Sequence, residues 1–66
     1  MNATQRAQEK IEAVSALLRW MAKSGTSAEV VAKRLGVTDS TIYNWLNGDT
    51  LPTGKGLESL KRLVRS

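Results

Sequence analysis

The sequence predicts an all-α protein, built as one compact domain of four helices within a range of three to five. Apolar residues recur at spacings of three and four along most of the chain, which is the periodicity of one buried face of an α-helix. No stretch alternates apolar and polar residues as a half-buried strand does, and glycines or capping residues separate the periodic segments. The 66 residues suffice for one domain, which we expect to span residues 1–66.

The composition narrows the classes of function. The sequence has no cysteine and no histidine, which excludes disulfides and the usual zinc ligand sets, so we expect neither a metal nor another cofactor. No apolar run is long enough to cross a bilayer and no signal peptide is visible, so we expect a cytoplasmic protein without a membrane partner. The formal net charge of +4 favours an anionic partner. The positive excess lies in the flanks, because segment 26–48 balances to zero.

The first predicted helix spans about residues 4–23, with Thr4 as its N-cap. One apolar stripe along it consists of Ala7, Ile11, Val14, Leu18 and Met21, and a second stripe beside it consists of Ala13, Leu17 and Trp20. Together the stripes cover roughly 200° of the helix, which is more than one core face needs. Two interpretations stay open: the helix lies at the centre of the bundle, or Leu17 and Trp20 contact a second copy of the chain.

The second predicted helix spans about residues 27–35. Thr26 and Glu29 have the spacing of a capping box, in which Thr26 is the N-cap and Glu29 reaches back to it. Ala32 is small enough to let a neighbouring helix cross closely. We expect Gly36 to adopt a positive φ where the chain leaves this helix, because glycine has no Cβ that would clash there.

The third predicted helix spans about residues 39–46 and has Thr38 as its N-cap. Ile42, Trp45 and Leu46 recur at the spacing of an inward face. Two short helices joined by a tight turn, with small and apolar residues at these separations, predict a helix-turn-helix motif.

The outer face of this third helix carries hydrogen-bonding side chains. An α-helix fits the major groove of B-form DNA, where base edges present distinguishable donors and acceptors. Asn44 can pair with adenine, Ser40 can donate or accept, and Asp39 can accept from cytosine N4. The predicted base-contacting residues are Asp39, Ser40, Tyr43 and Asn44. For Asp39 the alternative role is a favourable charge in the first turn of the helix.

Phosphate contacts are expected from helix N-termini, nearby hydroxyls and a cation. The candidates are Thr26, Ser27, Thr38, Thr41, Asn47, Thr53 and Lys55. For each hydroxyl the alternative is helix capping, and one residue can do both. The last predicted helix spans about residues 54–65 after a cap at Thr53, and its inward residues are Leu57, Leu60, Leu63 and Val64.

The segment AEVVAKRLGVTDSTIYNWLNGDTLP, followed by an apolar helix, resembles the lambda-repressor-like family of phage repressors, Cro proteins and small bacterial regulators. The resemblance covers about residues 26–64, and residues 4–23 correspond to the preceding helix of the family. It implies binding to operator DNA, usually as two-fold dimers, with the second motif helix in the major groove. It also implies that the four predicted base-contacting residues face the bases and that Asn47 lies near the DNA backbone.

The chain departs from the family pattern at three places. Ala28 stands where the family often has a glutamine that holds a phosphate, so we expect that contact to be absent or shifted to Ser27. Asp49 and Thr50 stand where many relatives have basic residues. The last helix is short and leaves little chain for a fifth helix with a dimer contact. The candidate dimer interface therefore consists of Leu17, Trp20, Leu63 and Val64.

The sequence thus predicts a DNA-binding transcriptional regulator, located on the nucleoid when bound. We expect a small homodimeric repressor from a phage or mobile element that binds an inverted-repeat operator in double-stranded DNA and has no small-molecule effector. Repressors of anti-CRISPR operons and antitoxin-type autoregulators fit this size.

Two alternatives remain. The segment STIYNWLNGDTLP also resembles excisionase-like and AlpA-like DNA-binding proteins, which usually add a β-hairpin wing. A protein-interaction module on the same fold is the second alternative. We do not expect an enzyme, because the sequence has no histidine, no cysteine and no glycine-rich phosphate loop with the required spacing.

Overall fold

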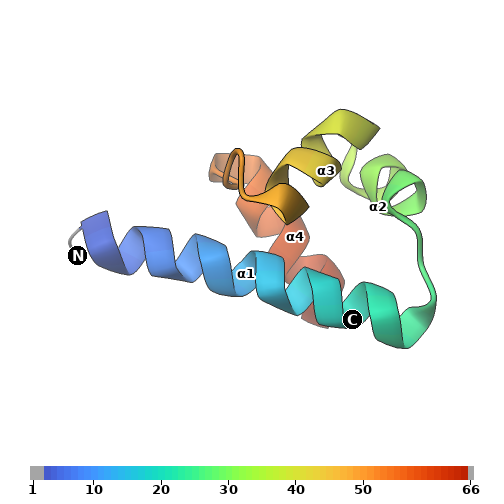
Figure 1. Ribbon diagram of the computed structural model, residues 1–66, viewed down its shortest axis with the longest axis horizontal. Coiled ribbons are helices and arrows are strands. Elements are labelled where there is room, and N and C mark those ends of the chain that lie inside the picture. The colour runs from blue at the N-terminus through green and yellow to red at the C-terminus, as the bar shows by residue number, and fades with distance from the viewer. Residues whose placement is uncertain (1–2, 66) are drawn as a thin grey trace.

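The structure, a computed structural model, describes the backbone of residues 3–65 and the side chains of residues 7–65. The helices are α1 (Ala3–Ser24), α2 (Ala28–Leu35), α3 (Asp39–Asn47) and α4 (Gly54–Arg65). Figure 1 shows α1 along one side of the molecule, with α2 and α3 above it and α4 behind. Residues 3–65 contain no strand, and the predicted all-α, four-helix fold is confirmed. None of these helices combines the length and apolar composition that crossing a bilayer requires.

The start of α2 differs from the prediction by one residue. Ser27, not Thr26, is its N-cap, because the Ser27 hydroxyl oxygen accepts from the Val30 N–H at 3.4 Å. Thr26 instead belongs to the end of α1, where its N–H donates to the Met21 carbonyl at 3.1 Å. The capping box at Thr26 is therefore wrong, and Glu29 has a different partner, described below.

The hydroxyls at the end of α1 are already paired. The Ser24 hydroxyl donates to the Trp20 carbonyl at 2.8 Å, so the Thr26 hydroxyl must donate to Ser24 Oγ, which lies 2.7 Å from Thr26 Oγ1. The predicted N-cap of α1 at Thr4 is also wrong. The helix begins at Ala3, so Thr4 lies inside it.

The turn between α2 and α3 forms as predicted. Gly36 has φ 71° and ψ 33°, the left-handed conformation that glycine adopts without a Cβ penalty. The Val37 N–H donates to the Ala32 carbonyl at 3.0 Å and the Gly36 N–H to the Lys33 carbonyl at 3.3 Å, which closes the end of α2. Ala32 is 1% exposed, as expected where two helices cross closely.

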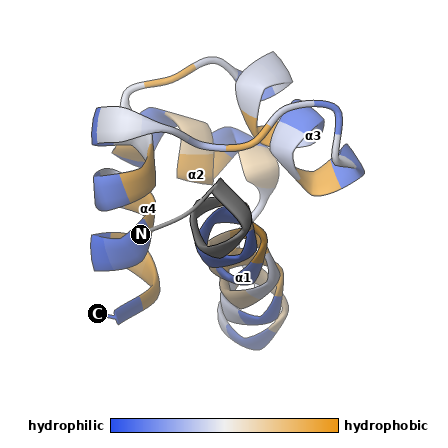
Figure 2. Ribbon diagram, turned by 90° about the vertical axis from the view of Figure 1, so that its left-hand side faces the viewer, coloured by the Kyte–Doolittle hydropathy of each residue, from blue (hydrophilic) through white to orange (hydrophobic). Residues whose placement is uncertain are grey.

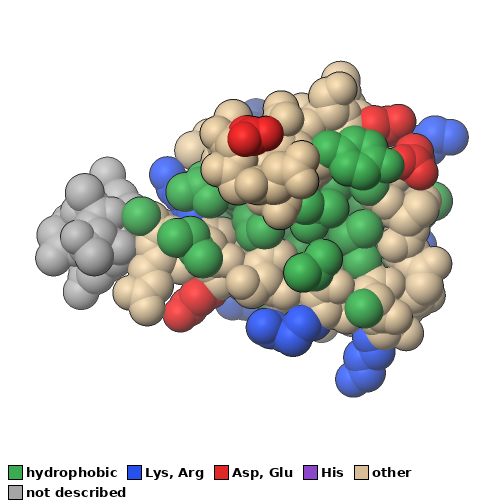
Figure 3. Space-filling model, in the orientation of Figure 1, with side chains coloured by type: hydrophobic (Ala, Val, Ile, Leu, Met, Phe, Trp, Pro, Cys, Tyr) green, Lys and Arg blue, Asp and Glu red, His purple; other side chains and the backbone are tan. Residues whose placement is uncertain are grey.

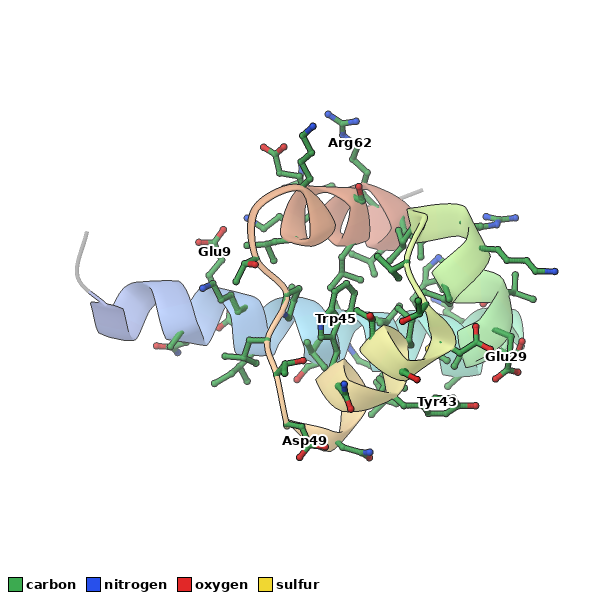
Figure 4. All side chains as sticks on the ribbon, turned by 90° about the horizontal axis from the view of Figure 1, so that it is seen from above. Glu9, Glu29, Tyr43, Trp45, Asp49 and Arg62 are labelled. Carbon is green, nitrogen blue, oxygen red and sulfur yellow. The ribbon has the colours of Figure 1, made fainter. Side chains whose placement is uncertain are left out.

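Each helix contributes a fully buried side chain to one hydrophobic core. Leu17 of α1, Val31 of α2, Ile42 of α3 and Leu60 of α4 are all 0% exposed. Trp45 extends from α3 into the space between α1 and α4, as seen in Figure 4. Figure 2 shows that the hydrophobic side of each helix is turned toward the others. Among the described residues, no polar or charged residue is buried.

The two apolar stripes of α1 each have residues at the core, and the first also has residues in solvent. Leu17 lies in the core and Trp20 packs against it, whereas Ile11 and Leu18 of the other stripe are 53% and 58% exposed. Leu63 of α4 is also buried, at 8% exposure. The chain's own core surrounds both side chains, which favours the interpretation that α1 lies centrally in the bundle over a contact of Leu17 or Leu63 with a second copy. Trp20 and Val64 remain partly exposed, and their contact with a second copy stays a prediction.

An ion pair connects α1 to α4. The Lys61 ammonium donates to a Glu9 carboxylate oxygen, and both side chains remain partly exposed. The hydrogen bond and the positive charge of Lys61 lower the pKa of Glu9 below its usual value. Because exposed ion pairs contribute little to stability, this contact adds little to the packing of α1 against α4.

Two glycines in the first turn of α4 give a matched pair of stability predictions. A Cβ at Gly56 would lie 3.5 Å from Trp45 Cζ2, an ordinary contact, so Gly56→Ala should raise the free energy of unfolding by about 0.5–1 kcal/mol. Gly54 has φ 51°, where a Cβ is strained, so Gly54→Ala should lower the free energy of unfolding by about 1 kcal/mol. Thermal denaturation followed by circular dichroism measures both. Shifts of the same sign in both variants would contradict the described start of α4.

Candidate nucleic-acid interface

The core holds α3 in one orientation. Ile42 is 0% exposed and Trp45 is 5% exposed, as their inward spacing predicted. The opposite side of α3 is therefore turned to solvent, where Asp39 and Ser40 are exposed and Tyr43 is 48% exposed. Three of the four predicted base-contacting residues thus share an accessible surface, which we call the α3 outer face (Asp39, Ser40 and Tyr43).

Asn44, the fourth predicted base-contacting residue, lies at the edge of that face and is partly buried. Its backbone carbonyl accepts from the Asp49 N–H at 2.9 Å and from the Thr50 N–H at 3.4 Å. These bonds fold the chain back after Gly48, whose φ of 82° ends α3. The Asn44 side chain is therefore less accessible than that of Tyr43, and it lies beside the turn that follows α3.

A hydrogen bond across the motif fixes the Tyr43 side chain. The Tyr43 hydroxyl donates to Glu29 Oε2 at 2.6 Å, and Figure 4 shows the two side chains side by side. This hydrogen bond and the negative charge of the carboxylate raise the pKa of Tyr43. Sequence reasoning missed this role, because it assigned Glu29 to a capping box. The available signal was an acid in the first turn of one motif helix and a phenol near the middle of the next.

We expect the single tyrosine of the chain to titrate above its ordinary pKa of 10.0, measured by ultraviolet absorbance of the phenolate. The pKa of Tyr43 is raised in the folded state. At pH values below the pKa of the unfolded state, the contact therefore makes its full contribution to the stability of the fold. That contribution is lost as the pH rises through the pKa of the folded state. Glu29→Gln keeps an acceptor oxygen and removes the charge, so the pKa of Tyr43 should move back toward 10.0. An unchanged titration in that variant would contradict the contact.

Two helix N-termini carry exposed hydroxyls. Ser27 caps α2, and Thr38 caps α3 by accepting from the Thr41 N–H at 3.3 Å. The Thr38 and Thr41 hydroxyls also lie 2.9 Å apart and share a hydrogen bond. Capping is thus observed for Ser27 and Thr38, and both side chains remain exposed beside backbone N–H groups that attract anions. Contact with a phosphate stays a prediction for all three residues.

The other predicted phosphate-contacting residues divide into two groups. Thr26 is partly buried and its hydroxyl is paired within the chain. Asn47, Thr53 and Lys55 are exposed at the end of α3 and around the start of α4. The Thr53 carbonyl accepts from the Leu57 N–H at 3.3 Å, so its backbone starts α4.

Exposed carboxylates lie on the α3 outer face and on the segments next to it in the motif. Glu29, Asp39 and Asp49 are all exposed, on α2, on α3 and in the turn that follows α3. Figure 3 shows acidic side chains on the upper side with a lysine or arginine side chain beside them at the right, and further lysine or arginine side chains along the lower edge next to another acidic one. Because like charges repel, an anionic ligand gains little non-specific attraction here, and its binding must depend on hydrogen bonds and helix N-termini.

Residues 17–63 match a family model described as Helix-turn-helix. The matched segment begins within α1, covers both motif helices and ends near the C-terminus of α4. It therefore includes the α3 outer face together with the core residues that hold it in place. Comparisons with curated proteins and with solved structures found no match.

Proposed function

Because the chain belongs to the lambda-repressor-like helix-turn-helix family, whose members bind DNA, we propose that it is a sequence-specific transcriptional regulator. In this proposal α3 enters the major groove of double-stranded DNA. The observation that carries the proposal is the orientation of α3, with Ile42 and Trp45 in the core and the hydrogen-bonding outer face in solvent.

The chemistry of the outer face supports direct readout of bases. The Ser40 hydroxyl can donate or accept, and the amide of Asn44, at the edge of the face, can pair with the donor and acceptor edge of adenine. Asp39 can accept only, so next to a base it selects the N4 amino group of cytosine. Carboxylates close to phosphates oppose binding unless such a base contact compensates. This combination favours a protein that binds weakly to random DNA and more tightly to its operator.

Phosphate contacts in the proposal come from the two capped helix ends and one cation. Ser27 and Thr38 present hydroxyls beside free backbone N–H groups, which is how helix N-termini bind phosphates. Lys55 is the exposed cation at the start of α4. These contacts would fix the orientation of α3 on the duplex and would add salt-dependent affinity.

We further propose that the regulator is a homodimeric repressor of phage or mobile-element type, acting on an inverted repeat. The family resemblance supports a two-fold arrangement, since two α3 helices of a symmetric dimer read symmetric half-sites. Such a protein would be controlled by its own concentration, because the occupancy of the operator follows mass action.

Selection of bound sequences from a random DNA pool tests this proposal. We expect enrichment of an inverted repeat whose half-site centres are about one helical turn apart or a multiple of it. Affinity for the selected DNA should fall steeply with salt, on the order of one log unit per contacted phosphate for each tenfold rise in salt. A pool that stays random through successive rounds would overturn the proposal.

A second candidate function is a protein-interaction module on the same fold. The observation that favours it is the group of carboxylates around α3, Glu29, Asp39 and Asp49, which repel a phosphate backbone. Such a module would fail the selection experiment and would show little salt dependence toward duplex DNA. An excisionase-like or AlpA-like protein is less well supported, because residues 3–65 contain no strand for a wing.

A further inference from the structure

An apolar strip on α1 has no partner within the chain. Ile11 and Leu18 are 53% and 58% exposed, and they lie seven residues apart, which places them on the same side of the helix. Ser15 and Ala22 share that side and are also exposed. We call this surface the α1 strip (Ile11, Ser15, Leu18 and Ala22). It lies on the side of α1 away from Leu17, the residue that faces the core.

We propose that two copies of the chain pair through the α1 strip, with their α1 helices antiparallel. The strip is self-complementary in that arrangement. When Ser15 lies near the two-fold axis, Ile11 of each copy faces Leu18 of the other, so one pattern serves both sides of an isologous interface. Ser15 is small and allows the helices to approach closely at the crossing. The pairing also removes the two large, exposed side chains Ile11 and Leu18 of each copy from water.

The charges beside the strip fit the same pairing. Glu12 and Arg19 are both exposed and flank the strip on one side, again seven residues apart. In an antiparallel pair, Glu12 of one copy lies next to Arg19 of the other, and the symmetry repeats this opposite-charge contact. Among side chains 7–65 the structure gives neither residue an ion pair of its own. Glu12 and Arg19 thus favour a second copy in the antiparallel orientation.

A partly exposed apolar surface at the ends of α1 and α4 suits a second copy less well. A groove between the C-terminal parts of α1 and α4 has Trp20 and Val64 in its lining, and Arg19 and Lys23 line it as well. A two-fold contact through this groove would bring cations of both copies together, which costs free energy. A two-fold contact through the α1 strip instead brings Glu12 of one copy next to Arg19 of the other. The α1 strip therefore fits a second copy better.

The inference rests on the proposed two-fold arrangement, but its test needs no DNA. Sedimentation equilibrium of the full chain, from micromolar to millimolar concentration, should show a monomer–dimer equilibrium. Leu18→Glu should weaken the dimer at least about 100-fold, because each dimer contains the changed position twice. Val30→Glu is the matched control, since Val30 is 44% exposed on α2 and outside the strip, and it should leave the dimer constant unchanged. Circular dichroism checks that both variants keep their helices.

A charge exchange identifies the orientation of the pair. Glu12→Arg and Arg19→Glu should each weaken the dimer, on the order of 5- to 10-fold, and the double variant should restore it because the opposite charges meet again. A monomer at millimolar concentration would overturn the inference. So would a dimer that Leu18→Glu leaves intact, or a double variant no better than the single ones. None of these outcomes bears on DNA binding, which the selection experiment tests separately.

Discussion

Trp45→Ala should leave most of the chain unfolded at room temperature. Trp45 is 5% exposed and lies among α1, α3 and α4, so its removal deletes a large buried surface and leaves a cavity. Replacing a buried tryptophan by alanine lowers the free energy of unfolding by about 3–5 kcal/mol. A domain of 66 residues without disulfides has a total stability of only about 3–5 kcal/mol. The helical circular dichroism signal and the cooperativity of urea unfolding measure this loss.

Trp20→Ala is the matched control, since Trp20 is the other tryptophan of the chain and remains partly exposed on α1. It should cost about 1–2 kcal/mol and leave a cooperative unfolding transition, because less surface is returned to water. If Trp20→Ala unfolds the chain and Trp45→Ala does not, the core is centred on α1 rather than under α3. The orientation of the outer face would then be wrong as well.

The second large effect concerns specificity. Asn44→Ala should reduce the ratio of operator to random-DNA affinity by about 5- to 150-fold, which is the discrimination of one good contact to a base edge. Fluorescence anisotropy with labelled operator and random duplexes measures the ratio. We expect the variant to fold, because Asn44 is only partly buried. Its backbone carbonyl, which closes the turn after α3, is unchanged in the variant.

Lys55→Ala is the control for that measurement. Lys55 is exposed at the start of α4 and is expected to contact a phosphate, so its loss should weaken operator and random DNA about equally. It should also make the fall of log affinity with log salt concentration less steep, by roughly the amount that one contacted phosphate contributes. An unchanged specificity ratio in Asn44→Ala would remove Asn44 from the recognition surface. A changed ratio in Lys55→Ala would place the lysine at a base rather than at the backbone.

The sequence predicted the helices and the turn because their signals are local. The end of α2 depends on Gly36, whose left-handed conformation was predicted from its residue type and position, and α3 ends in the same way at Gly48. The inward positions of Ile42 and Trp45 follow from periodicity. The cap of α2 was missed by one residue because two hydroxyls are adjacent there, and the end of α1 uses Thr26.

Other features depend on how distant segments pack, which periodicity does not contain. Both stripes of α1 are apolar, and only the placement of the other helices decides that Leu17 is buried and Leu18 is 58% exposed. The bond between Glu29 and Tyr43 likewise requires the angle between α2 and α3. The contact of Asp39, Ser40 and Asn44 with DNA stays a prediction, since residue type and exposure permit such contacts without establishing them.

The bond between Tyr43 and Glu29 bears on which chemical group Tyr43 offers to a ligand. Its hydroxyl proton is already committed to Glu29 at 2.6 Å, so the side chain can offer a ligand its aromatic ring and an acceptor lone pair of the hydroxyl oxygen. In the proposed complex, a ring restrained by this bond would lose little rotational entropy on docking; it suits the methyl group of thymine, and the hydroxyl oxygen suits an amino group on a base edge. Replacement by phenylalanine would keep the ring and remove both the bond to Glu29 and the acceptor oxygen.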